Sequence, residues 1–114
     1  MPFVSITTAK KIDGGTKAEL NSRIGEIMPV LPGKNLDNTL LCINDGVSMF
    51  MKGKPNDGVF VSVQVYKKSP EDAKKEFSKK IYEILKHILG LDSESCVYMN
   101  FTEFGNWAAN GDYF

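Results

Sequence analysis

The sequence contains the same order of elements twice, a strand, a helix and a second strand, and each copy takes about half of the 114 residues. Apolar helical spacing marks the helices at about residues 16–28 and 70–89. Runs of β-branched, aromatic and other apolar residues predict strands at 2–8, 39–45, 59–66 and 96–104. A helix between two strands suits a parallel crossover. We therefore predict one two-layer α+β domain over residues 1–114, with two helices on one face of a four-stranded sheet.

Local signals set the expected ends of the two helices. The first should begin after Thr16, which has an acid three residues later at capping-box spacing. Pro29 should kink or end it, and Pro32-Gly33 should close it at the latest. The second should begin with Ser69 as N-cap and Pro70 at the first helical position. Gly90 is a suitable residue to end it.

Two helices on one face would leave the other face of the sheet bare. The run TLLCIND at residues 39–45 is almost continuously apolar and predicts a buried strand. Burying the bare face against further copies of the same sheet removes the conflict. We therefore expect a closed homo-oligomer.

The charge balance and the cysteine and histidine content exclude several classes of function. Lys plus Arg and Asp plus Glu are each 14, so the net charge is zero, which argues against a nucleic-acid partner. No apolar run approaches the ~18 residues of a membrane span, and the first residues lack the features of a secretory signal. Cys42 and Cys96 form no CxxC pair, and His87 is the only histidine, so we expect no metal site. These features favour a cytoplasmic location.

Pro2 is the most unusual candidate for chemistry. Removal of Met1 would leave a secondary amine at the start of a strand. An apolar pocket disfavours the protonated amine and lowers its pKa toward neutrality, which suits a base that abstracts protons. Two alternatives stay open: proline at this position is also common without any such role, and a retained Met1 would make the nitrogen an amide.

Three further polar residues are candidates for a binding pocket. Lys34 lies in the loop after the first helix, where a cation could hold a carboxylate and lower the pKa of a neighbouring amine. Tyr98 and Asn100 are two residues apart in a strand and therefore share one face. Read alone, Lys34 also fits a solvated lysine and Tyr98 a core tyrosine.

Four stretches of the chain, in order, resemble one known family. They are MPFVSITT at residues 1–8, Pro32-Gly33-Lys34, Val97-Tyr98-Met99-Asn100-Phe101, and the tail Asn106 to Phe114 with its tryptophan and Asn-Gly pair. Together they resemble the family of macrophage migration inhibitory factor and D-dopachrome tautomerase, within the tautomerase superfamily. The similarity spans essentially the whole chain, and the ordered combination carries it.

The resemblance implies a homotrimer whose sheets surround a central channel. It also implies keto–enol tautomerisation of small aromatic 2-keto acids such as phenylpyruvate, and of dopachrome-type compounds, without metal or cofactor. Pro2 matches the catalytic proline, and Lys34 matches the lysine that contacts the acidic end of the substrate. Val65 matches a position whose backbone contacts substrate. Tyr98 and Asn100 match residues that reach the proline of a neighbouring protomer.

The chain departs from the family pattern at three places. The usual phenylalanine-glycine-glycine-serine stretch is replaced around Phe50–Lys54, and the isoleucine-glycine that ends the third strand is replaced by Val65-Tyr66. Tyr66 is therefore expected to narrow the mouth of the pocket. The cysteine pair of some members is absent at residues 58–61, so we expect no thiol oxidoreductase activity through it.

Two classes of function stay open from the sequence. The first is a tautomerase that uses Pro2 as general base and acid. The second is a cytokine-like signalling protein that binds a cell-surface receptor, with weak or vestigial catalysis. The resemblance also implies a possible second location outside the cell, since members of this family are secreted without a signal peptide.

Overall fold

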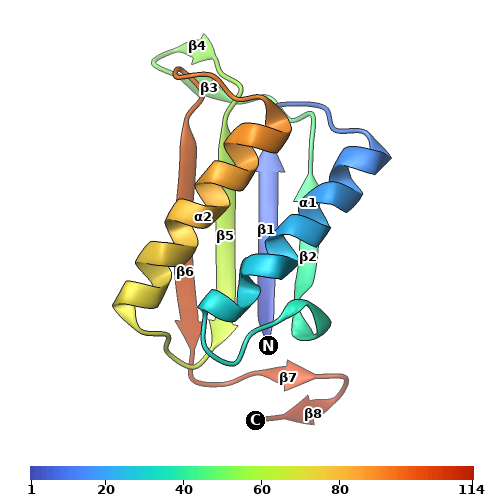
Figure 1. Cartoon of the computed structure of the whole chain (residues 1–114), viewed down its shortest axis with the longest axis vertical. Coiled ribbons are helices and arrows are strands. Elements are labelled where there is room, and N and C mark those ends of the chain that lie inside the picture. The colour runs from blue at the N-terminus through green and yellow to red at the C-terminus, as the bar shows by residue number, and fades with distance from the viewer.

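The computed structural model describes residues 1–114 and contains one four-stranded mixed sheet (Figure 1). The order across the sheet is β2-β1-β5-β6, with both pairs of the repeat parallel and β1 antiparallel to β5 in the centre. The strands are β1 (Pro2–Thr8), β2 (Leu40–Asn44), β5 (Val59–Tyr66) and β6 (Val97–Phe104). The predicted duplicated β-α-β architecture is confirmed.

Both helices lie on the same face of this sheet (Figure 1). Helix α1 (Gly14–Ile27) is followed by a short 3₁₀ turn at Met28–Val30, and α2 (Glu71–Leu89) is the longer of the two. Gly90 ends α2 with a positive φ of 62°, a conformation in which glycine has no Cβ to strain. Neither helix of the structure is long and apolar enough to cross a membrane.

Two small hairpins lie at opposite ends of the sheet (Figure 1). One is formed by β3 (Phe50–Met51) and β4 (Lys54–Pro55), and the other by β7 (Ala108–Ala109) and β8 (Asp112–Tyr113). Positive φ angles at both central residues of the second hairpin, 49° and 90°, are those of a tight primed turn, which Asn-Gly sequences favour. This C-terminal hairpin lies at the same end of the molecule as the N-terminus.

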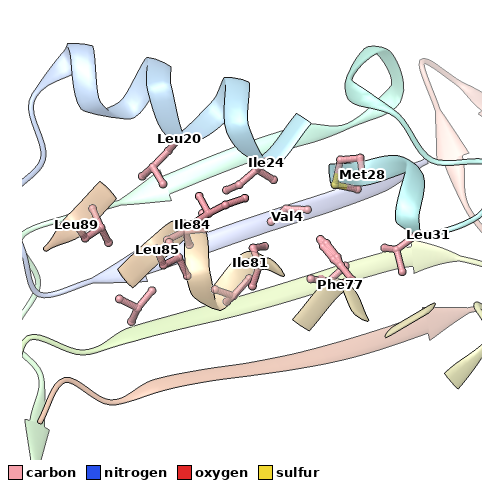
Figure 2. Close-up of a cluster of buried hydrophobic side chains, with 14 of the residues drawn as sticks. Val4, Leu20, Ile24, Met28, Leu31, Phe77, Ile81, Ile84, Leu85 and Leu89 are labelled. Carbon is pink, nitrogen blue, oxygen red and sulfur yellow. The ribbon is translucent and has the colours of Figure 1, made fainter. Parts of the chain in front are cut away.

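The hydrophobic core fills the space between the helices and the sheet (Figure 2). The strands contribute alternate residues, because successive side chains of a strand point to opposite faces. Phe77 of α2 is fully buried at the centre and meets Phe101 of β6 edge to face, with 5.9 Å between ring centroids. The other large, fully buried side chains include Ile6, Leu20, Ile24, Met28, Leu31, Ile81 and Leu85.

Both predicted N-caps are wrong. Helix α1 is capped by Asp13, whose Oδ1 accepts from the backbone N–H of Thr16 at 2.7 Å, so Thr16 lies inside the first turn. Helix α2 has Pro70 at the N-cap position and no side-chain capping bond. Acidic residues in its first turn, Glu71 and Asp72, provide charge stabilisation at that end instead. Ser69 has a different role, described below.

The strand predicted as buried at residues 39–45 is only half-buried in one protomer. β2 is an edge strand, so Leu41 and Ile43 pack against the core while Leu40 on the other face is 68% exposed. The uncovered face of the sheet also carries Phe60 and Tyr98, both exposed. The apolar run therefore indicates a strand with two apolar faces, of which the protomer covers one.

We predict that Phe77→Ala lowers the free energy of unfolding by about 3–5 kcal/mol, because the substitution leaves a cavity at the centre of the core. Urea unfolding at one fixed protein concentration measures the change. Tyr82→Ala is the matched control, since Tyr82 is on the same helix but 40% exposed. A loss no greater than that of the control would contradict the central place of Phe77 in the core.

A candidate active site at the amino-terminal end of β1

Pro2 lies at the start of a central strand. It is the first residue of β1, it is buried, and it faces Val65 of β5 in the register of the sheet. A proline has no backbone N–H to donate to a ladder, so the first position of a strand is one that tolerates it. The nitrogen of Pro2 is thus held beside the end of β5 by strand pairing.

Lys34 is brought to the same end by the loop between α1 and β2. Before it, Leu31 is fully buried and its carbonyl accepts from the backbone N–H of Lys34 at 3.0 Å. After it, Leu36 packs so closely on α1 that a Cβ at Gly25 would lie 2.5 Å from it. Between these two anchors, the Lys34 ammonium donates to the carbonyl oxygen of Tyr66 at 3.4 Å.

The chain's terminal amine lies within the influence of Lys34. Burial and then the charge and hydrogen bonding of Lys34 lower the pKa of the Met1 amine below its ordinary value of 8.0. Both causes disfavour a second positive charge at this place. The structure thus brings Lys34 to the amino-terminal end of the chain, next to the predicted site residue Pro2.

A cavity of about 690 Å³ opens beside the amino terminus. The C-terminal segment forms one side of it, and the starts of β1 and β2 form the other. Its lining includes Met1, Pro2, Phe3, Asp37, Asn38, Thr39, Leu40, Gln64, Trp107, Ala108, Ala109 and Asn110. Lys34 lies outside this lining, on the side of the turn after β5.

Val65 is fully buried and forms part of the wall behind Pro2. Its neighbour Tyr66 lies against the C-terminal residue Phe114, with 5.7 Å between the ring centroids. The ammonium of Lys67 lies 5.2 Å from the centre of the Tyr66 ring, at cation–π distance. Tyr66 thus joins the end of β5 to the C-terminal tail. It is not among the residues that line the cavity, so its narrowing of the pocket mouth stays a prediction.

Tyr98 and Asn100 are not brought to Pro2 within one protomer. Both are exposed on the uncovered sheet face, where they pair in register with Phe60 and Ser62 of β5. Since Pro2 pairs with Val65, Asn100 is three positions and Tyr98 five positions farther along the sheet. At ~3.3 Å per residue these offsets are about 10 and 17 Å.

The Tyr98 hydroxyl stays protonated over the physiological pH range. The neighbouring side chain of Cys96 raises the pKa of Tyr98 above its ordinary 10.0, first by hydrogen bonding and then by charge. A protonated phenol can donate a hydrogen bond from the uncovered face. The two cysteines of the chain are both free.

Sequence reasoning missed Glu103. It is on the core-facing side of β6 and pairs in register with Val65, so Pro2, Val65 and Glu103 follow one another across three strands. The signal that could have found it is the alternation of β6, because Val97, Met99 and Phe101 on the same side are all apolar. The cavity-lining residues Phe3, Leu40 and Gln64 were also missed.

This arrangement combines a partly desolvated amine, a nearby cation and an apolar wall, which suits proton transfer next to a group that becomes negative. No three His, Cys, Asp or Glu residues are placed to hold a metal ion. The charged group that acts on the amine is the Lys34 ammonium.

Comparison with solved structures identifies the fold. Leishmania major MIF2 is 20% identical with a TM-score of 0.90 over 100% of this chain and 97% of that one. The macrophage migration inhibitory factor-like protein of Entamoeba histolytica is 20% identical with a TM-score of 0.84, over 99% and 98%. A fused 4-OT described as an asymmetric trimer is 11% identical with a TM-score of 0.79, over 96% and 93%.

The fold is therefore the one shared by tautomerase-superfamily proteins. The sequence resemblance to the macrophage migration inhibitory factor family is confirmed at the level of fold. No protein-family model matches the sequence, and no curated protein matches it either.

We predict that Lys34→Met raises the pKa of the terminal amine, because it removes the positive charge and keeps most of the side-chain length. The pH dependence of the ¹⁵N chemical shift of that amine measures it, on protein whose intact mass shows whether Met1 is present. Lys52→Met is the control, since Lys52 is in the hairpin at the opposite end of the sheet. An unchanged amine pKa in Lys34→Met would remove Lys34 from the site.

Proposed function

We propose that this chain is a keto–enol tautomerase of phenylpyruvate-like acids, and that Pro2 is its general base and acid once Met1 is removed. The observation that carries the proposal is the buried start of β1, where the terminal amine has a lowered pKa beside Lys34. The fold shared with tautomerase-superfamily structures supports it. Removal of Met1 transfers the terminal amine to Pro2, one residue deeper in the same environment.

The proposed reaction moves one proton and leaves the oxidation state of the substrate unchanged. The neutral Pro2 nitrogen takes a proton from the carbon next to the ketone, so a C–H bond breaks and an N–H bond forms. The released electron pair forms the C=C bond of an enolate, whose oxygen becomes negative. The protonated Pro2 then gives its proton to that oxygen, and the enol leaves. Since no electrons leave the substrate, the step needs no redox cofactor.

Lys34 is proposed to bind the carboxylate of the substrate and to stabilise the developing enolate. A cation placed where charge develops lowers the barrier more than it stabilises the ground state. Its ammonium is held by one long contact to the Tyr66 carbonyl, so it retains donors for a ligand. Phe3, Leu40 and Trp107 give the adjacent cavity apolar surfaces that suit an aromatic ring.

The complete site is proposed to form between protomers of a homotrimer. The uncovered sheet face carries exposed Leu40, Phe60 and Tyr98, apolar area that a second copy would cover. A tautomerase-superfamily structure of the same fold is an asymmetric trimer. Tyr98 and Asn100 are too far along their own sheet to reach their own Pro2, so they are proposed to act on the proline of a neighbour.

We predict that Pro2→Gly lowers kcat/KM for phenylpyruvate by about 10²–10⁴-fold, because general acid–base catalysis contributes that much. Glycine also permits removal of Met1, so the variant retains a free terminal amine and tests the secondary amine and its fixed position. The assay follows enol formation by ultraviolet absorbance, with intact mass and oligomeric state checked for both proteins. Unchanged turnover in a processed Pro2→Gly protein would sink the assignment of Pro2 as the base.

We predict that two impaired variants restore activity when they assemble together. Pro2→Gly lacks the secondary amine of proline, and the double variant Tyr98→Phe/Asn100→Ala lacks the residues from the neighbour. In randomly mixed trimers about a quarter of the sites take Pro2 from one variant and Tyr98 and Asn100 from the other. Light scattering should give about three times the 12.7 kDa protomer mass. Mixed assemblies that show only the average of the two parent activities would contradict a shared site.

The second function, receptor binding by a secreted cytokine-like protein, stays a prediction from the sequence resemblance. The cytoplasmic and extracellular locations stay predictions as well. The second function is separable from catalysis by the same variant. Receptor binding that survives Pro2→Gly with full affinity would assign signalling to a surface distinct from the proline, while tautomerase activity reports on the proline itself.

A further inference from the structure

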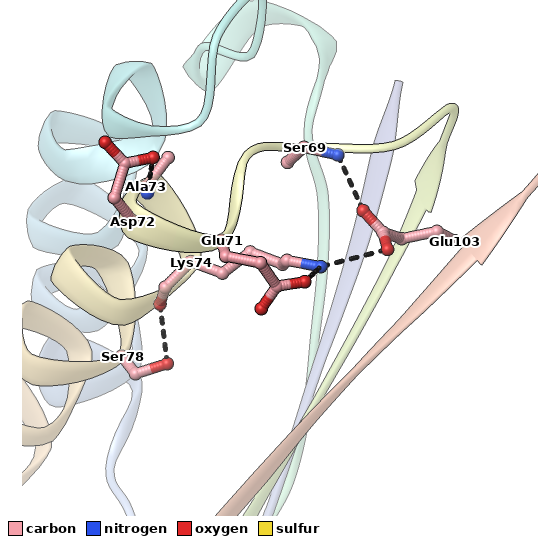
Figure 3. Close-up of polar contacts among 7 residues, drawn as sticks. All are labelled: Ser69, Glu71, Asp72, Ala73, Lys74, Ser78 and Glu103. Carbon is pink, nitrogen blue, oxygen red and sulfur yellow. Dashed lines mark hydrogen bonds and ion pairs between the residues drawn. The ribbon is translucent and has the colours of Figure 1, made fainter.

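The carboxylate of Glu103, on the core-facing side of β6, connects this strand to the turn between β5 and α2 (Figure 3). Glu103 Oε2 accepts from the backbone N–H of Ser69 at 2.6 Å, and Glu103 Oε1 lies 3.0 Å from the Lys74 ammonium. Lys74 also binds Glu71 at 3.0 Å. The Glu103 and Lys74 side chains are only 19% and 12% exposed, so water screens this pair less than a surface pair.

Glu103 is placed where the strand pattern requires an apolar residue. The preceding residues on the same side of β6, Val97, Met99 and Phe101, pack against the core. Removing a carboxylate from water is unfavourable unless it is paired and hydrogen-bonded, and here both oxygens have partners. Ser69 and Lys74 lower the pKa of Glu103, so it stays ionised well into the acidic range. The carboxylate at this position therefore ties β6 to the turn before α2 instead of filling the core.

The turn held by Glu103 begins with the peptide group that contacts Lys34. The N–H of Lys67 donates to the carbonyl of Phe104 at 2.8 Å, and the C=O of Tyr66 accepts from Lys34 Nζ at 3.4 Å. These two groups belong to one planar peptide unit and point in opposite directions. The bond from the Lys67 N–H to β6 therefore fixes the peptide unit so that the Tyr66 carbonyl, on the opposite edge, points at Lys34.

The backbone at this turn is strained and needs external support. Lys67 has a φ of 68°, a conformation that costs a residue with a Cβ free energy. Such a residue keeps this conformation only when its surroundings fix it. The Phe104 carbonyl holds the start of the turn by accepting from the Lys67 N–H, and the Glu103 carboxylate holds its end by accepting from the Ser69 N–H.

We propose that Glu103 is a positioning residue for Lys34: it anchors the turn at Ser69 so that the Tyr66 carbonyl holds the Lys34 ammonium beside the amino terminus. The role deepens the proposed tautomerase function and rests on it. Glu103 touches no substrate, and it acts through Tyr66 and Lys34. Loss of the anchor would let the Tyr66–Lys67 peptide rotate and release Lys34 from its place.

The test compares Glu103→Ala with Lys34→Ala and with the double variant. Glu83→Ala is the control, an exposed carboxylate on α2 outside this network. Steady-state kinetics with phenylpyruvate separate KM from kcat, and the ¹⁵N titration of the terminal amine gives its pKa independently of activity. Thermal unfolding and light scattering establish that each protein is folded and assembled.

We expect Glu103→Ala to raise KM about fivefold, because it weakens the placement of the group that binds the carboxylate. The amine pKa should rise in the same direction as in Lys34→Ala. In the Lys34→Ala background, Glu103→Ala should change KM by less than about twofold, because the two substitutions remove the same interaction. Glu103→Gln should raise KM less than Glu103→Ala, since its amide oxygen still accepts from Ser69, and it carries the test if Glu103→Ala does not fold.

Two results would overturn the role of Glu103. One is a folded variant that is less stable but has the KM and amine pKa of the unsubstituted protein. The other is an effect on KM that adds in full to that of Lys34→Ala. An unsubstituted protein with no tautomerase activity would contradict the proposed function instead, and the amine titration would still decide whether Glu103 positions Lys34.

Discussion

The pairing of β1 on both of its edges is the constraint on which the rest of the structure depends. Because β1 is bonded to β2 on one side and to β5 on the other, the first residues of the chain form the middle of the sheet. A chain terminus is usually mobile and hydrated. Here the terminal amine is instead partly desolvated, and the charge of Lys34 lowers its pKa in the same direction. The lowered pKa of the terminal amine thus follows from the central place of β1 in the sheet.

The two faces of the sheet differ in what covers them and in their side chains. The helix-covered face holds the core, in which Phe77 meets Phe101, and this face alone accounts for the alternation seen along β5. The uncovered face carries apolar side chains such as Leu40 next to polar ones such as Asn100. A mixed face of this kind suits an interface with another protein that retains some water, so that its polar residues still have hydrogen-bond partners. Self-association through it would both cover apolar area and complete a site.

The fold could be predicted from the sequence because its strands and helices each have a regular spacing of apolar residues. The alternation from Val59 to Tyr66 and the helical spacing through Phe77 and Ile81 depend only on local geometry, and the observed elements match them closely. The two N-cap predictions were wrong for different reasons. Asp13, three residues before Thr16, accepts from the Thr16 N–H and caps α1 by a local contact. Ser69 is held instead by a contact far along the chain, since its backbone N–H donates to Glu103 of another strand.

The candidate site was predictable only in part, for a related reason. Pro2 and Lys34 were both named from the sequence, Pro2 because its chemistry follows from its position in the chain. The place of Lys34 beside the amino terminus depends on the loop from Leu31 to Leu36. Glu103 acts at a distance of two strands from the amine, through a peptide group whose N–H and C=O face different partners. No local pattern encodes such a relay, because each contact joins residues far apart in the chain. The end of β5 therefore connects three parts of the molecule: the sheet, the turn before α2, and the Lys34 side chain that acts on the terminal amine.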